Sequence, residues 1–224
     1  MAFTRPKLEQ YAAQQRGRFE QLLEEFVEIP SVSADPGRKG ELERCAELGA
    51  ATLRAFGAKA EIHRIPGGPP VVIGGFESGK GRPTVTVYNH LDVVPASKET
   101  EPWKTEPFRF VRQGDTYFGR GTTDDKGPAL SALFGARAAV EAGVPVNIKF
   151  LWELEEEVGS PHFADTLRAI GPAAATDGVV VSDTVWVARG RPAQSAGLRG
   201  LQPLTLRLEI GATDQHSGTT GGLA

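Results

Sequence analysis

Histidine and carboxylate side chains stand at the ends of several predicted strands in this 224-residue sequence. The run TVTVYNHLDVVP places His90 and Asp92 on one face of a strand end, because side chains two positions apart in a strand point the same way. Asp124 and Asp125 lie in FGRGTTDDKGP, a glycine-flanked turn before a predicted helix, and the strand VVVSDT ends in Asp183. We expect these side chains to converge, because ligands of open parallel α/β sheets bind beyond the carboxyl ends of the strands.

The run LWELEEEVGS adds four carboxylates within five positions, at Glu153, Glu155, Glu156 and Glu157. Like charges this close repel each other, so these side chains either all face water or surround a positive ion. A lone His-x-Asp pair is more often structural, and a triple glutamate is usually a solvated surface. Four acidic motifs at strand ends are much harder to ascribe to chance. An imidazole among several carboxylates suits a borderline cation such as zinc, and the sequence therefore favours a metal site.

Composition and charge exclude several other classes of protein. The formal net charge of −3 provides no basic surface for nucleic acid, and no segment is long enough to span a membrane. The start, MAFTRPKLEQ, lacks the apolar run of a signal peptide, and GRGTTDDKG lacks the spacing of a phosphate-binding loop. The single cysteine, Cys45, is expected to be a buried helix residue in a cytoplasmic protein. His63 and His162 are interpreted as residues without a role in the site.

Hydrophobic periodicity predicts alternating helices and strands. Helices are expected over residues 8–29, 40–57, 128–143 and 159–170. Strands are expected over 61–65, 71–76, 84–90, 147–154 and 178–184, with a hairpin at 108–121 that turns at 113–115. This alternation predicts an α/β fold, with a mixed, mostly parallel sheet covered by helices on both faces.

The pattern changes after about Gly197. PLTLRLEIG alternates apolar and polar positions as a half-buried strand does, and the glycine-rich HSGTTGGLA follows it. We therefore expect residues 195–224 to begin a second domain.

Seven motifs in order resemble the signatures of one known family. They are YNHLDVVPA, PWKTEPF, GDTYFGRGTTDDKGP, ELEEEVGS, VVVSDTVWVARGRP, GLRG and DQHSGTTGG, and they run from about Ile29 to the last residue. The family is that of the two-zinc aminoacylases and carboxypeptidase-G-type peptidases. The WxxxPF stretch with GRGxxDDKGP, and the SDxxW stretch with GLRG, favour its carnosine-dipeptidase-like branch over the deacetylases.

The resemblance implies a set of ligands for two zinc ions. His90 and Asp183 would bind one ion, Glu157 would bind the other, and Asp124 would bridge them. The peptide bond after Asp124 would be cis, and Asp92 would hold either the imidazole of His90 or a neighbouring ligand in place. Manganese or cobalt could replace zinc in a carboxylate-rich site.

The resemblance also implies three catalytic residues, which are Asp92, described above, Glu156 and His216. Glu156 would be the general base that takes a proton from the water held between the two zinc ions, and it would return that proton to the leaving amine. His216, in the HSG motif, would help to stabilise the oxyanion, often across a dimer interface.

In the family the chain continues beyond the HSG motif. The resemblance therefore implies a zinc-exopeptidase-like catalytic domain over residues 1–194 that lacks its C-terminal part, and residues 195–224 as the beginning of an α+β lid and dimerisation domain. The rest of the lid, an arginine for the substrate carboxylate and a last histidine ligand would lie further on. Without that histidine, the zinc site of Glu157 would be the weaker one.

The expected function is metal-dependent hydrolysis of the peptide bond in dipeptides or short peptides by a homodimer that binds neither nucleic acid nor membrane. Two alternatives stay open. One is an N-acyl amino acid deacylase with the same metal ligands, and the other is a non-catalytic fragment that binds one metal ion or none.

Overall fold

The computed structural model describes residues 4–183, 186–188, 190, 191, 193, 195, 197 and 200–207. The chain divides into two units, residues 1–192 and 193–224. The described residues of the second unit form no helix or strand.

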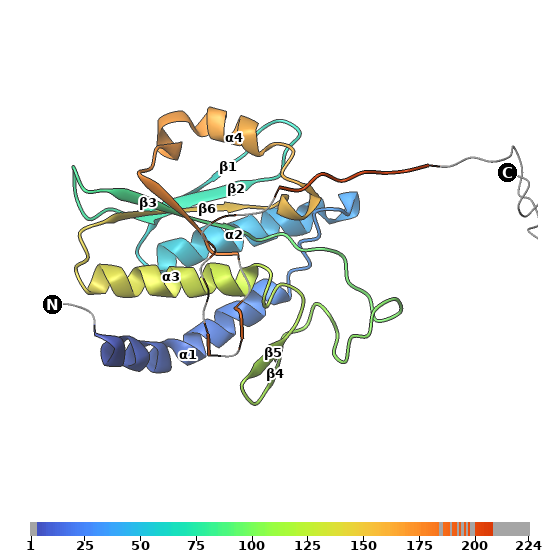
Figure 1. Ribbon diagram of the computed structural model, residues 1–224, viewed down its shortest axis with the longest axis horizontal. Coiled ribbons are helices and arrows are strands. Elements are labelled where there is room, and N and C mark those ends of the chain that lie inside the picture. Colours follow the sequence, from blue (N-terminus) through green and yellow to red (C-terminus); the bar gives the residue numbers. More distant parts are fainter. Residues whose placement is uncertain are drawn as a thin grey trace, which may run out of the picture. The chain divides into compact units, whose positions relative to one another are not determined.

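A five-stranded mixed sheet forms the centre of the first unit (Figure 1). Its strands, in spatial order, are β1 (Lys59–His63), β2 (Val71–Phe76), β6 (Asn147–Glu153), β3 (Thr84–His90) and β7 (Gly178–Val181). β3 runs parallel to both β6 and β7, whereas β2 runs antiparallel to both β1 and β6. The predicted mixed sheet is thus confirmed, and within the described residues its parallel part is the half formed by β6, β3 and β7.

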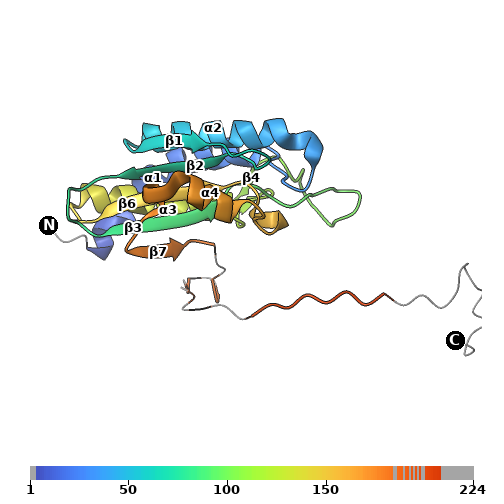
Figure 2. The same cartoon turned by 90° about the horizontal axis from the view of Figure 1, so that it is seen from above.

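Helices cover both faces of this sheet, as predicted (Figures 1 and 2). They are α1 (Arg5–Val27), α2 (Lys39–Ala55), α3 (Lys126–Glu141) and α4 (Phe163–Ile170), with short 3-10 helices η1 (Pro36–Arg38), η2 (Glu156–Val158) and η3 (Gly171–Ala174). Cys45 is buried on α2, as expected. No described helix is both long and apolar enough to cross a membrane.

Alternation along the strands explains why the sheet has two apolar faces. Phe150 and Trp152 of β6 and Val72 of β2 belong to the core that α1, α2 and α3 complete. Their neighbours Leu151 and Ile73 belong to a smaller core on the other face, which α4 completes. Because successive strand residues point to opposite faces, a nearly continuous apolar run is what a sheet covered on both sides requires.

Some boundaries differ from the prediction. β1 begins two residues earlier than expected, and α4 begins at Phe163 rather than at residue 159. The later start of α4 follows from Gly159 and Ser160, whose φ values of 86° and 50° lie in the left-handed region and exclude a right-handed helix. Residues 203–207 of the last predicted strand are exposed and form no strand. Residues 208–211 lie outside the described part.

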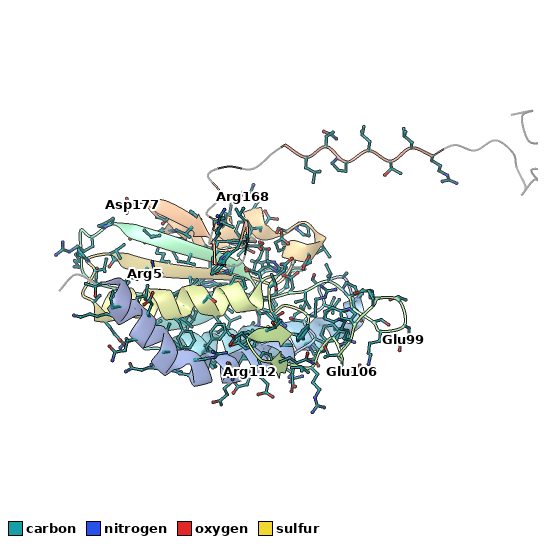
Figure 3. All side chains as sticks on the ribbon, turned by 60° about the horizontal axis from the view of Figure 1, so that its bottom comes forward. Arg5, Glu99, Glu106, Arg112, Arg168 and Asp177 are labelled. Carbon is teal, nitrogen blue, oxygen red and sulfur yellow. The ribbon has the colours of Figure 1, made fainter. Side chains whose placement is uncertain are left out.

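The predicted hairpin is present as a separate two-stranded sheet of β4 (Val111–Gln113) and β5 (Thr116–Phe118). Gly114, with φ of 61°, makes the turn. The hairpin is tied to α1, because Glu20 accepts hydrogen bonds from Arg112 Nη1 at 2.9 Å and from Tyr117 Oη at 2.7 Å. Figure 3 labels Arg112 on this hairpin.

Candidate metal centre

Polar side chains from separate segments meet at one edge of the sheet. β6, β3 and β7 are parallel, so their carboxyl ends lie together. His90 is the last residue of β3, Glu156 follows β6, and Asp183 follows β7. Asp124 comes from the turn before α3. His90, Asp124 and Asp183 each offer one donor atom, and these three atoms all lie within 4.8 Å of one another. They form a three-donor group that could hold a metal ion.

Asp92 fixes the orientation of the His90 imidazole. Both side chains are fully buried. His90 Nδ1 lies 3.0 Å from the backbone oxygen of Asp92 and 3.3 Å from its Oδ1. Because both of these oxygens are acceptors, Nδ1 is assigned as the ring nitrogen that carries the proton, and Nε2 faces the centre.

The surroundings of His90 Nε2 require a positive charge. Nε2 lies 2.8 Å from Asp124 Oδ1 and 3.6 Å from Asp183 Oδ2. A neutral ring protonated at Nδ1 would turn the lone pair of Nε2 toward these carboxylates. Burial alone lowers the pKa of His90, but the hydrogen bond with Asp92 and the charges of the nearby aspartates raise it to about 10. A second proton or a metal ion satisfies this arrangement equally well.

The donor set fits a divalent ion such as zinc. An imidazole nitrogen with carboxylate oxygens is a common zinc ligand set. Neighbouring donors around a tetrahedral ion with bonds of about 2.0 Å lie about 3.3 Å apart, which is compatible with the separations between His90 Nε2 and the two aspartates.

Burial and the acidic surroundings raise the pKa values of three carboxyl groups, one of which, Asp183, belongs to the three-donor group. Burial raises the pKa values of Glu156, Glu157 and Asp183, and the charge of Asp124 raises all three further. Glu156 Oε2 lies 3.9 Å from His90 Nε2, but neither Glu156 nor Glu157 belongs to the three-donor group found among the described residues. Carboxylates that oppose one another's ionisation are relieved by a cation placed among them.

Asp92 also holds the turn that follows β6. Its Oδ1 accepts a hydrogen bond from the backbone N–H of Glu156 at 3.2 Å, and its Oδ2 accepts one from that of Glu157 at 3.1 Å. One buried carboxylate thus links the end of β3 to the two glutamates.

Asn89 and Asp125 form a network that sequence reasoning did not assign. Asp125 is fully buried, and its Oδ2 accepts hydrogen bonds from Asn89 Nδ2 at 2.8 Å and from the backbone N–H of His90 at 3.1 Å. Asn89 Nδ2 also donates to the backbone oxygen of Ser182 at 3.0 Å, next to Asp183. Burial raises the pKa of Asp125 to about 8, although the Asn89 hydrogen bond opposes this shift. The signal in the sequence was Asn89, a polar amide inside the predicted strand TVTVYNH.

Two glycines allow the turn that carries Asp124 to form. A Cβ on Gly127 would lie 2.1 Å from the backbone oxygen of Thr122, and a Cβ on Gly121 would lie 2.9 Å from Lys126 Cδ. The peptide bond between Asp124 and Asp125 is cis, as the resemblance implies. The glycines of GRGTTDDKG thus serve close packing of the chain on itself.

Two of the four glutamates do not join the centre. Glu155 accepts hydrogen bonds from the backbone N–H of His162 at 2.7 Å and faces its Nδ1 at 2.9 Å. Glu153 is buried and accepts hydrogen bonds from Tyr88 and Ser160. The alternative that all four side chains face water is therefore wrong, because Glu153 and Glu155 are buried and bind partners of their own. His216 lies outside the described residues.

Comparison with known proteins identifies the family. The model of peptidase family M20/M25/M40 matches residues 86–197, which is half of the chain and contains every described residue of the centre. The chain belongs to this family.

Several relatives carry dipeptidase names. The chain is 35% identical to the Cys-Gly metallodipeptidase dug1 of Schizosaccharomyces pombe, covering 99% of this chain and 49% of the relative. It is 34% identical to the Beta-Ala-His dipeptidase of Rattus norvegicus, covering 98% and 48%. The crystal structure of human carnosine dipeptidase 1 matches with a TM-score of 0.70 and 33% identity over 80% of this chain and 41% of that one. The chain thus spans about half the length of the curated relatives it matches.

Proposed function

We propose that this protein hydrolyses the peptide bond of dipeptides or short peptides with divalent metal ions. The observation that carries the proposal is the three-donor group of His90, Asp124 and Asp183 at the carboxyl edge of the sheet. Membership of a peptidase family, and relatives whose names include two dipeptidases, support the reaction and the size of the substrate.

The proposed ligands belong to two zinc ions, with manganese or cobalt as possible replacements. His90 and Asp183 would hold the first ion, Glu157 would hold the second, and Asp124 would serve both. Burial, followed by the charge of Asp124, raises the pKa of Glu157, and a cation near its carboxyl would relieve this, which supports its assignment. When bound, the ions supply Lewis acidity, which strengthens water as a nucleophile near neutral pH and polarises the peptide carbonyl.

Glu156 is the proposed general base. Its side chain is partly exposed at the rim of the centre, within reach of water and substrate, while its backbone N–H is held by Asp92. Glu156 takes the proton of the attacking water at a carboxylate oxygen and then donates it to the nitrogen of the leaving amine. Asp92 keeps the imidazole of His90 in one tautomer and one orientation.

The domain, partner and location assignments belong to the same proposal. The order of the sequence motifs supports residues 195–224 as the beginning of a lid and dimerisation domain, with His216 as a donor to the oxyanion in a homodimer. The low net charge and the single cysteine support a cytoplasmic location.

A direct test is hydrolysis of Cys-Gly and β-Ala-His by the 224-residue chain with Zn²⁺ or Mn²⁺, alongside elemental analysis of bound metal. The wild-type chain should cleave at least one dipeptide. Glu156→Gln should lower turnover by about 100-fold or more and keep the metal content, because the base is not a ligand.

Three other results would decide against the proposal. Faster cleavage of N-acetyl amino acids than of dipeptides would indicate a deacylase. Bound metal without any hydrolysis, or an active Glu156→Gln variant, would contradict the proposed mechanism in this chain.

A further inference from the structure

A buried hydrogen-bond cluster closes the turn that carries Glu156 and Glu157. We propose that Glu153 and Ser160 are positioning residues, whose hydrogen bond sets where these two glutamates stand. The part of this inference that concerns metal binding rests on the proposed function, whereas the part that concerns the turn does not.

Glu153 stands at the last position of β6, in register with His90 on β3. Its side chain is 1% exposed. Glu153 Oε1 accepts a hydrogen bond from Tyr88 Oη and another from Ser160 Oγ, the latter at 3.0 Å. The cluster therefore joins Tyr88 on β3 and Glu153 on β6 to Ser160, the last residue of the turn.

The buried carboxylate of Glu153 lowers the stability of the folded chain. Its Oε2 is buried and has no hydrogen-bond partner among the described residues. A buried polar atom without a partner costs free energy, and so does a buried carboxylate that faces other acidic groups. Buried polar groups that break the rules of packing are expected at functional sites, which points to a role beyond holding the core together.

Ser160 is held in a conformation that the turn requires. Its φ of 50° is in the left-handed region, which is uncommon for residues other than glycine, and it follows Gly159 with φ of 86°. The backbone N–H of Ser160 donates to the oxygen of Glu155 at 3.0 Å, and that of Gly159 donates to the oxygen of Glu156 at 2.8 Å. The Oγ bond to Glu153 therefore anchors the end of a short closed loop.

The turn has three anchors of different kinds. Asp92 holds the backbone of Glu156 and Glu157, and Glu155 holds His162 at the start of α4. The Glu153–Ser160 bond is the side-chain anchor, which adds to the backbone bond of Ser160 and connects that residue to the last residue of β6. Carboxylates gathered in one turn repel each other and favour an open loop, so a closing bond of this kind opposes that repulsion.

Amide hydrogen exchange of the metal-free chain tests the turn itself. Ser160→Ala and Tyr88→Phe should each speed exchange of the amides of residues 156–160 by about tenfold, with little change in β1 and β2. Tyr117→Phe is the matched control, because Tyr117 also donates its hydroxyl to a glutamate, but that glutamate, Glu20, lies on α1 and outside the turn of residues 153–160. Unchanged exchange at residues 156–160 in Ser160→Ala would overturn the inference.

Zn²⁺ titration by calorimetry tests the consequence for the metal. Ser160→Ala should lower Zn²⁺ affinity about fivefold in the wild-type chain and should cause no further loss in a Glu157→Gln background, because both changes act on the same ligand. A general structural defect would instead lower affinity in both backgrounds. Loss of affinity in Glu157→Gln without any loss in Ser160→Ala would contradict the positioning role.

The two experiments distinguish failure of the positioning role of Glu153 and Ser160 from failure of the proposed metal ligands. Faster exchange in Ser160→Ala, with Zn²⁺ affinity unchanged in both Ser160→Ala and Glu157→Gln, would support the closing bond and contradict Glu157 as a ligand.

Discussion

At the scale of single residues, buried polar groups define the centre. Asp92 shows this most clearly, because its two carboxylate oxygens serve three partners at once. They face His90 Nδ1 and accept the backbone N–H groups of Glu156 and Glu157. A carboxylate, which accepts at both oxygens and donates at neither, is the side chain that suits three such partners.

Replacing Asp92 by asparagine tests this requirement. The amide keeps the shape but turns an N–H₂ group toward a backbone N–H or toward the imidazole, which places donor against donor. We expect Zn²⁺ affinity, measured by calorimetry, to fall by about 10- to 100-fold. Asp115→Asn, at an exposed carboxylate of the hairpin turn, is the control and should leave the affinity unchanged. Wild-type affinity in Asp92→Asn would contradict the role assigned to Asp92.

At the scale of elements, close approaches of the backbone position the centre. Helix α3 begins next to Asp124, and its second residue, Gly127, lies against the backbone of Thr122. Gly127 also donates its N–H to the oxygen of Gly121 at 3.1 Å. The start of α3 and the turn before it are therefore built as one unit.

Gly127→Ala should destabilise the chain by about 2 kcal/mol or more, because the new methyl group cannot avoid a backbone oxygen 2.1 Å away. Gly135→Ala on the same helix is the matched control, since no heavy atom lies within 4 Å of its added Cβ. That change should stabilise the chain by up to about 1 kcal/mol through helix propensity. Urea unfolding of both variants is the measurement. Equal changes in the free energy of unfolding of the two variants would show that the close contact at Gly127 does not determine the cost of the substitution.

Glu20 links α1 to the hairpin, and its contribution to the free energy of unfolding should depend on pH. Hydrogen bonds from Arg16 and Tyr117 hold the pKa of Glu20 below its usual range. Its contribution to stability is therefore present above the unfolded pKa of about 4.3 and is lost as pH falls through the folded value. Glu20→Gln should lower the free energy of unfolding by about 1 kcal/mol at pH 7, and the difference should shrink as pH falls below about 4.

Urea unfolding at several pH values measures this difference. Glu24→Gln, at an exposed position one turn further along α1, should change stability by less than about 0.5 kcal/mol at every pH. A constant effect of Glu20→Gln between pH 7 and pH 3 would contradict the assigned role of its charge.

At the scale of the whole molecule, the centre links segments that are distant in the sequence. His90, Asp124 and Asp183 come from β3, from the start of α3 and from the end of β7. An ion held by all three binds the folded chain and not the unfolded one, so binding and folding are coupled.

Zn²⁺ should therefore raise the thermal stability of the chain. At about 100 times the dissociation constant, bound Zn²⁺ adds about 2.7 kcal/mol to the free energy of unfolding. Thermal unfolding should show the increase, and a chelator should reverse it. Asp183→Asn, at a partly exposed proposed ligand, should remove most of the increase and leave the metal-free chain nearly unchanged. Equal stabilisation of Asp183→Asn and wild type would exclude Asp183 as a ligand.

The local elements could be predicted from the sequence because periodicity and turn residues act over a few positions. β2 and β3 have the predicted bounds, and the first three helices differ from theirs by only a few residues. The meeting of His90 with Asp124 and Asp183 was also predictable, since each lies at or near a strand end or at a helix start. Parallel strands bring such ends together whatever the details of packing.

Only the tertiary structure decided which acidic residues face the centre. Glu155 and Glu156 are adjacent in the sequence, yet one binds His162 and the other approaches His90. Two left-handed residues, Gly159 and Ser160, follow them, and His162 stands at the start of α4, which packs against β3 through Phe163 and Tyr88. Asn89 and Asp125 likewise meet across 36 positions of the sequence. Periodicity determined the elements of this protein, but the direction of each polar side chain depended on distant groups, because a hydrogen bond needs its partner in place.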